Sequence, residues 1–209
     1  MTERSEPAAP ARPGSRRALL LAAAAVLVTA AAAIWGWGGL GGSADTAARP
    51  PFEITRANVA PPPLSLPLAD GGRVTLADAT GEVLVVNFWA TWCPPCRDEM
   101  PSMLRLGREL AERHPGRFKM VAVSVDESWD AVKEFFGGVM PPATTVALDV
   151  DQEVTRAWYC AARGGCPDSF KFPETYVVDR TGRLVAYMVG PRDWSDPAAR
   201  TFLEKLIGG

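Results

Sequence analysis

The sequence predicts an α/β fold in which helices cover both faces of a mixed central sheet, with a β-hairpin at the start of the domain and one transmembrane helix before it. Strand-like and helix-like segments alternate along residues 61–209. The run VLVVNFW at residues 83–89 is apolar or aromatic almost throughout, which is typical of a central strand buried on both faces. Parallel strands connected through helices require covering layers on both sides of the sheet.

The expected elements follow in order along the chain. Residues 64–68 and 73–76 are expected to pair as a hairpin, because the Asp-Gly-Gly sequence between them supplies the positive φ that such turns need. Ser128 is a suitable helix cap, and Pro197 suits the first position of a last helix. The other strands are expected at residues 83–89, 118–125, 145–148, 175–178 and 184–189, and the helices at residues 94–113, 128–136, 152–159 and 197–207.

The N-terminal part of the chain is typical of a membrane anchor. Residues 18–40 carry no charge and would form a helix about 35 Å long, enough to span a bilayer. Arginines outnumber glutamates in residues 1–17, so this tail is expected to stay in the cytoplasm and the rest to be exported. A signal peptide cleaved near residues 44–47 is the alternative. Gly- and Pro-containing motifs predict a flexible linker over residues 41–60, before the domain at 61–209.

Composition excludes several classes of protein. The chain has 209 residues, a formal net charge of −2 and 47% hydrophobic residues, so it contains enough apolar material for one packed domain. No stretch supplies the concentrated Lys and Arg surface of a nucleic-acid binder. A single His excludes a multi-histidine metal centre, and we expect neither a metal nor a cofactor.

The candidate chemistry lies in the WCPPC sequence. Cys93 and Cys96 stand between a predicted buried strand and a predicted helix, so one sulfur is placed at a helix N-terminus, where a thiolate is favoured. The second Cys lies one turn away, so the pair can alternate between dithiol and disulfide. A static bridge, or a zinc site shared with Cys160 and Cys166, remains an alternative, although the spacing of that second pair is unusual for zinc.

Two segments carry a family resemblance. The sequences NFWATWCPPC at residues 87–96 and FPETYVVD at residues 172–179 resemble the thioredoxin superfamily, and within it the membrane-anchored TlpA/ResA-like thiol-disulfide oxidoreductases, including DsbE/CcmG-type cytochrome c maturation proteins. The resemblance extends over about residues 64–206 and implies a thioredoxin-like fold. It also implies that Cys93 is the exposed nucleophile and Cys96 the more buried resolving thiol.

Further residues take roles through the same resemblance. Pro173 matches the cis-proline that faces the disulfide in this fold, and Pro101 matches a position where the helix after the motif kinks, because proline removes a helical N–H. Glu99 matches an acidic residue of the ResA-like branch. We expect it to modulate the thiol pKa values and proton transfer at Cys96, with its own pKa raised by burial; a solvent-facing Glu in the first turns of the helix is the alternative.

The rim of the site is expected to be apolar. Trp92 is the main candidate for contact with substrate, together with Pro94, Pro95 and Phe172. Trp89, at the end of a core strand, is expected to pack inside the domain.

Cys160 and Cys166 depart from the common family pattern and lie in what looks like an insertion. In an exported chain such a pair is expected to form a structural disulfide that fixes a Gly-rich loop. A second redox pair that exchanges with Cys93, or a loop that shapes partner choice, is the alternative.

The sequence therefore favours a thiol-disulfide oxidoreductase that reduces protein disulfides. By resemblance it would lie on the outer, periplasmic side of a bacterial inner membrane, receive electrons from a membrane donor of the DsbD/CcdA type, and act on apocytochrome c or a copper-assembly factor. A copper-handling or chaperone-like module without redox turnover is the main alternative; no Met- or His-rich cluster flanks the motif to complete a copper site. A peroxide-reducing enzyme on the same fold is a minor one.

Overall fold

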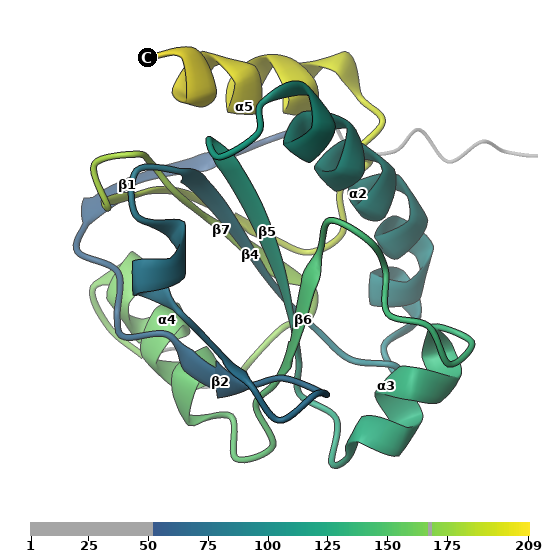
Figure 1. The fold of residues 1–209 in the computed structure, drawn as a ribbon. Coiled ribbons are helices and arrows are strands. Elements are labelled where there is room, and N and C mark those ends of the chain that lie inside the picture. Colours follow the sequence, from purple (N-terminus) through teal and green to yellow (C-terminus); the bar gives the residue numbers. More distant parts are fainter. Residues whose placement is uncertain (1–51, 167–168) are drawn as a thin grey trace, which may run out of the picture. The chain divides into compact units, whose positions relative to one another are not determined.

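A six-stranded mixed sheet forms the centre of the domain in the computed structural model, which describes residues 52–166 and 169–209. The strand order is β1-β8-β7-β4-β5-β6 (Figure 1). The strands are β1 (Thr55–Val59), β4 (Val83–Trp89), β5 (Phe118–Ser124), β6 (Thr145–Leu148), β7 (Glu174–Val178) and β8 (Leu184–Val189). Strands β4, β5 and β6 are parallel, whereas β7 is antiparallel to both β4 and β8.

The strand β4 is central because every one of its side chains is buried. Its parallel partner β5 and its antiparallel partner β7 leave no free edge. The continuous apolar run in the sequence thus corresponds to a strand with covered faces on both sides, as predicted. The loop that follows Trp89 leads directly to the two cysteines.

Helices cover both faces of the sheet. Residues of α2 (Pro94–Arg113) and α5 (Pro197–Gly208) pack with Val83 and Val85 on one face. Residues of α4 (Glu153–Arg163) pack on the other face, against the side chains that alternate with those two valines. Figure 1 shows α2 and α5 on one side and α4 on the other. The remaining helix, α3 (Trp129–Phe135), joins the α2 side through Val132.

The predicted hairpin is present as a separate two-stranded sheet. Strands β2 (Ser65–Pro67) and β3 (Arg73–Thr75) pair antiparallel, and Leu66 and Val74 face the core that α4 covers. The second strand is shorter than predicted, because Thr75 caps a 3-10 helix, η1 (Leu76–Ala79).

Two expected boundaries were wrong. The strand β1 lies inside the segment predicted as a linker up to residue 60, and it pairs antiparallel with β8. Ala57 and Val59 are its two partly buried residues, and so short an alternation does not predict a strand from the sequence. The helix α4 continues to Arg163 instead of ending at residue 159, and Gly164 ends it with a left-handed φ of 67°.

Other expectations were met. Ser128 occupies the N-cap position of α3, although its side chain makes no capping hydrogen bond. Asp196 caps α5 by accepting a hydrogen bond from the Ala198 N–H at 2.8 Å.

The predicted tail, membrane anchor and first part of the linker, residues 1–51, lie outside the described residues. Within residues 52–166 and 169–209, no helix is both long and apolar enough to cross a membrane.

Candidate active site

The two cysteines of the WCPPC sequence form a disulfide at the N-terminus of α2. Cys93 is the N-cap residue, and its sulfur accepts a hydrogen bond from the Cys96 N–H at 3.4 Å. Pro94 and Pro95 occupy the first turn, where their missing N–H groups leave no helical hydrogen bond unmade. After reduction, the free N–H groups of this helix end and its dipole favour a thiolate at Cys93.

The accessible side of the disulfide is narrow and apolar. Cys93 is 5% exposed and Cys96 is fully buried, so Cys93 is the more accessible thiol but far less exposed than predicted. Trp92 is 62% exposed, and its ring lies 6.0 Å from that of Phe172 in an edge-on arrangement. Phe172 also packs against the apolar cluster that contains both cysteines. Contact of these two rings, and of Pro94 and Pro95, with a substrate stays a prediction.

The peptide bond between Phe172 and Pro173 is cis, as the resemblance implied. Trp89, in contrast, is fully buried and packs against Phe135 and Phe136, as predicted for a core residue. Pro101 lies inside α2.

Glu99 is buried under the first turns of α2, so the solvent-facing alternative is wrong. Its carboxylate accepts hydrogen bonds from the side-chain amide of Asn87 at 3.0 Å and from the Arg192 N–H at 2.9 Å. Burial raises the pKa of Glu99 to about 7, although these two hydrogen bonds act to lower it. The residue is therefore poised to gain or lose a proton near neutral pH.

Asn87 joins this acid to the neighbouring strand. Its amide also donates to Thr175 Oγ1 at 2.9 Å, and the two residues are cross-strand partners in β4 and β7. Sequence reasoning identified Glu99 but missed Thr175 and Arg192, which approach this site only through the fold.

A pocket opens beside Glu99. Its volume is about 360 Å³, and it is bordered by α2 and by the loop that follows β8. The lining residues are Pro95, Asp98, Glu99, Ser102, Pro191, Arg192 and Asp193. This pocket gives the buried acid a side that faces solvent.

A second buried acid, Asp126, holds the loop that precedes Cys93. One carboxylate oxygen accepts from the Thr91 hydroxyl at 2.7 Å, and the other accepts from the Thr91 N–H at 3.0 Å and from Ser124 Oγ at 2.6 Å. Sequence reasoning missed this residue. Its position directly after a predicted parallel strand, at the same sheet edge as the cysteines, was the available signal.

Cys160 and Cys166 form the second disulfide, as predicted. Cys160 belongs to the last turns of α4, and Cys166 follows the end of that helix. Between them lies Arg163, whose guanidinium forms an ion pair with the buried carboxylate of Glu174. Burial raises the pKa of Glu174, while hydrogen bonds from Tyr176 and Arg163 oppose the rise.

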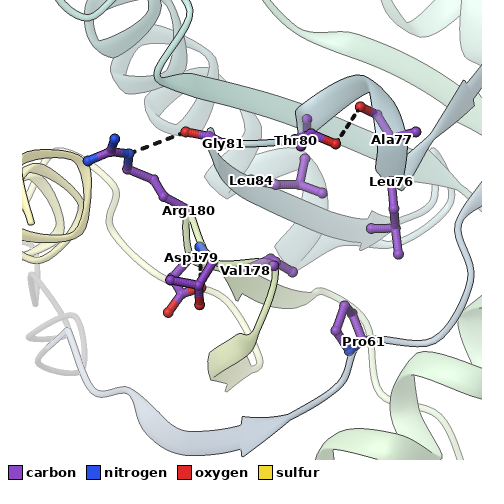
Figure 2. Close-up of a pocket in the computed structure, with 12 residues that line it drawn as sticks. Pro61, Leu76, Ala77, Thr80, Gly81, Leu84, Val178, Asp179 and Arg180 are labelled. Carbon is purple, nitrogen blue, oxygen red and sulfur yellow. Dashed lines mark hydrogen bonds between the residues drawn. The ribbon is translucent and has the colours of Figure 1, made fainter.

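Another pocket, of about 270 Å³, lies away from the cysteines (Figure 2). It is bordered by Leu84 at the start of β4, whereas Cys93 follows the end of that strand. Figure 2 shows Arg180 directed at the Gly81 carbonyl, to which it donates a hydrogen bond at 3.2 Å. Arg180 thereby links the loop after β7 to the turn before β4, and none of the four cysteines lines this pocket.

The described part of the chain contains no cluster of side chains suited to bind a metal ion. Across residues 52–166 and 169–209, no group of three or more His, Cys, Asp or Glu side chains is arranged to hold an ion. The two cysteine pairs form separate disulfides rather than one four-sulfur site.

Comparison with known proteins agrees with this geometry. The chain is 31% identical to thioredoxin-like protein YneN of Bacillus subtilis over 129 residues, which cover 62% of this chain and 69% of that protein. It is 32% identical over 123 residues to thiol-disulfide oxidoreductase ResA of Bacillus subtilis, covering 58% of this chain. The chain spans 60% of the length of that ResA protein.

Solved structures share the fold. The crystal structure of a thiol:disulfide interchange protein of the thioredoxin family from Chlorobium tepidum superposes with a TM-score of 0.58 and 30% sequence identity, covering 74% of this chain and 99% of that one. The model of the family described as Redoxin matches residues 50–203, most of the chain. The fold is thioredoxin-like, and the chain belongs to the Redoxin family.

Proposed function

We propose that this chain is a thiol-disulfide oxidoreductase that reduces disulfides in other proteins. The observation that carries the proposal is the Cys93–Cys96 disulfide at the N-terminus of α2, with the exposed ring of Trp92 next to it in the chain and the buried acid Glu99 one turn further along the helix. The names of the relatives ResA and the Chlorobium tepidum interchange protein support the same chemistry.

The reaction follows from the arrangement of the two sulfurs. The Cys93 thiolate attacks one sulfur of a substrate disulfide, a mixed disulfide forms, and the other substrate sulfur leaves as a thiolate. Cys96 then loses its proton and attacks the Cys93 sulfur, which releases the second substrate thiol. The protein ends in the Cys93–Cys96 disulfide state, and two electrons from a donor are needed to reduce it again.

Glu99 can receive the Cys96 proton. It lies one turn further along the same helix, and a pKa near 7 lets it hold or release a proton at neutral pH. The pocket beside it offers a path for that proton to solvent.

The cellular setting is part of the proposal. The uncharged residues 18–40 would anchor the chain in a bacterial inner membrane, with the domain on the periplasmic side, where disulfides persist. A membrane donor of the DsbD/CcdA type would supply the electrons. The substrate would be the disulfide of an apocytochrome c or of a copper-assembly factor.

Trapping of the mixed disulfide tests the exchange reaction. The reduced chain is mixed with an oxidised peptide that carries Cys-X-X-Cys-His, the attachment sequence of c-type haem. We expect rapid peptide reduction by the unaltered chain, an accumulating mixed disulfide with Cys96→Ser, and neither product with Cys93→Ser, as read by mass spectrometry.

The reduction potential tests the direction of the reaction. We expect the Cys93–Cys96 couple to lie near or below about −270 mV, as for thioredoxin. A couple near about −120 mV would instead identify a catalyst that introduces disulfides. No reversible couple at all would contradict redox turnover.

A further inference from the structure

The first residue of β7, Glu174, carries a carboxylate with almost no access to water. It directly follows Pro173 and is 1% exposed. The carboxylate accepts a hydrogen bond from the hydroxyl of Tyr176 and pairs with the guanidinium of Arg163. A buried carboxylate needs such partners, because losing its counter-ion leaves a charge without compensation. The position of Glu174 therefore depends on Arg163.

Arg163 is itself held on several sides. Its guanidinium lies 4.9 Å from the ring centre of Tyr159 and 5.1 Å from that of Tyr187. It also donates to the Tyr159 carbonyl at 3.1 Å and to Tyr176 Oη at 3.2 Å. A planar guanidinium can stack and form a directed ion pair at once, which a lysine cannot. The contact with Glu174 is therefore a fixed one.

The turn that carries Arg163 is closed by a covalent bond. Arg163 is the last residue of α4, and helix ends open readily. The disulfide joins Cys160 before it to Cys166 after it, and the Gly165 N–H donates to the Cys160 carbonyl at 3.0 Å. Residues 160–166 thus form a disulfide-closed turn that keeps Arg163 in place.

This turn and the residue before it contact the chain on both sides of Phe172 and Pro173. On the upstream side, the Tyr159 hydroxyl donates to the Lys171 carbonyl, and its ring packs against Phe172. On the downstream side, Arg163 pairs with Glu174. Phe172 in turn meets the exposed ring of Trp92 beside the active disulfide. The contacts form a continuous connection from the second disulfide to the rim of the first.

We propose that Arg163 is a positioning residue for thiol-disulfide exchange at Cys93. From the disulfide-closed turn it holds Glu174, and through Glu174 it sets the position of Phe172 at the rim. This inference rests on the proposed function. A peptide substrate must lie across the rim to present its disulfide, whereas a small disulfide needs only the Cys93 thiolate. Loss of Arg163 therefore slows exchange with the peptide and not with the small reagent.

The test compares two rate constants on the full chain with Cys93 and Cys96 reduced and the Cys160–Cys166 disulfide intact. One is measured with an oxidised Cys-X-X-Cys-His peptide and the other with 2-hydroxyethyl disulfide. For Arg163→Met we expect the peptide rate to fall about tenfold while the small-reagent rate stays the same. The double variant Arg163→Met/Glu174→Gln removes both charges, folds without a stranded carboxylate and should remain as slow. Recovery of the peptide rate in that double variant would overturn the proposal, because the stranded charge alone would then explain the loss.

Two further arms complete the test. Cys160→Ser/Cys166→Ser should slow the peptide reaction by itself but add little in the Arg163→Met background, since both act through one contact. Fully additive losses would also overturn the proposal. Arg113→Met is the matched control, because it breaks an ion pair with Glu204 between α2 and α5; both of its rates should match those of the unaltered chain.

The outcomes separate this inference from the function on which it rests. If the unaltered chain reduces neither disulfide, the proposed function fails. The other case is that the unaltered chain reduces both the peptide and 2-hydroxyethyl disulfide. If the Arg163→Met/Glu174→Gln variant then shows the same ratio of these two rates as the unaltered chain, only the positioning role fails.

Discussion

Glu99 is a carboxylic acid that is only 4% exposed, and its hydrogen bonds come from an amide side chain and a backbone N–H. Neither donor carries a full charge. The cost of burying the ionised form therefore outweighs the hydrogen bonds, and the pKa rises from 4.5 to about 7. Glu99 suits proton transfer, but its burial lowers the free energy of unfolding at high pH.

Glu99→Gln should change how stability depends on pH. The unfolded chain loses the Glu99 proton near pH 4.5 and the folded chain near pH 7, so the stability of the unaltered protein falls as pH rises through that interval. The shift corresponds to about 3 kcal/mol. Urea unfolding of the oxidised protein between about pH 4 and pH 8 measures it.

The comparison is made on oxidised protein because disulfide-bonded cysteines do not titrate. The stability of the Gln variant should rise relative to the unaltered chain across this interval. Two curves that run parallel from low to high pH would show that Glu99 does not titrate there.

Trp92 is expected to matter for substrate and little for folding. Its ring is 62% exposed and meets the ring of Phe172 edge-on. Trp92→Ala should change the free energy of unfolding by less than about 1 kcal/mol and slow the reaction with a peptide disulfide about tenfold. Stopped-flow kinetics and urea unfolding provide the two measurements.

Val139→Ala is the matched control for Trp92→Ala, because Val139 is also apolar and 75% exposed. Its peptide rate should equal that of the unaltered chain. If Trp92→Ala also reacted with the peptide as fast as the unaltered chain, Trp92 would have no part in substrate contact.

Among the predicted helices, α4 differs most from its expected bounds. It runs one turn further than expected, and this turn brings both Cys160 and Arg163 into the helix. The extension is stabilised by three features together, namely the Gly164 cap, the disulfide and the Glu174 ion pair. Hydrophobic periodicity reveals none of these three features, so a prediction from periodicity alone ends the helix too early.

Removal of the second disulfide should cost about 2 kcal/mol of stability, since the bond closes a short loop between residues six positions apart. Cys160→Ser/Cys166→Ser and the unaltered oxidised protein are compared by urea unfolding. A loss below about 0.5 kcal/mol would mean that the Gly164 cap and the ion pair hold this turn alone.

On the scale of the whole molecule, the N-terminal strand completes the sheet. β1 pairs with β8, and Ala57 and Val59 pack against the core on the α4 side. Phe52 and Ile54, just before it, pack against the core on the α2 side. The ring centres of Phe52 and Trp194 lie 5.3 Å apart there. The segment therefore contributes to the packing on both faces of the sheet.

A fragment that begins at Pro61 should be less stable than one that begins at Phe52, by about 3 kcal/mol, because it lacks these partly buried side chains. It should also associate, since β8 becomes an exposed edge. Urea unfolding and light scattering of the two fragments measure the two effects. Equal stability and a monomeric shorter fragment would assign β1 no part in folding.

The sequence by itself determined the features that depend on neighbouring residues. The apolar run of β4, the cysteines at the start of α2 and the prolines between them are contiguous, and local sterics, hydrogen bonding and burial patterns dictate their conformation. The order of strands and helices was predictable for the same reason.

The tertiary structure alone decided which distant residues meet. Glu99 meets the Arg192 N–H across 93 positions, and Thr91 meets Asp126 across 35. Arg163 pairs with Glu174 from the last turn of α4, a turn that lies within the disulfide between Cys160 and Cys166. The physical reason is that the energy of a buried charge depends on every group packed around it, and a linear sequence does not show which groups those are.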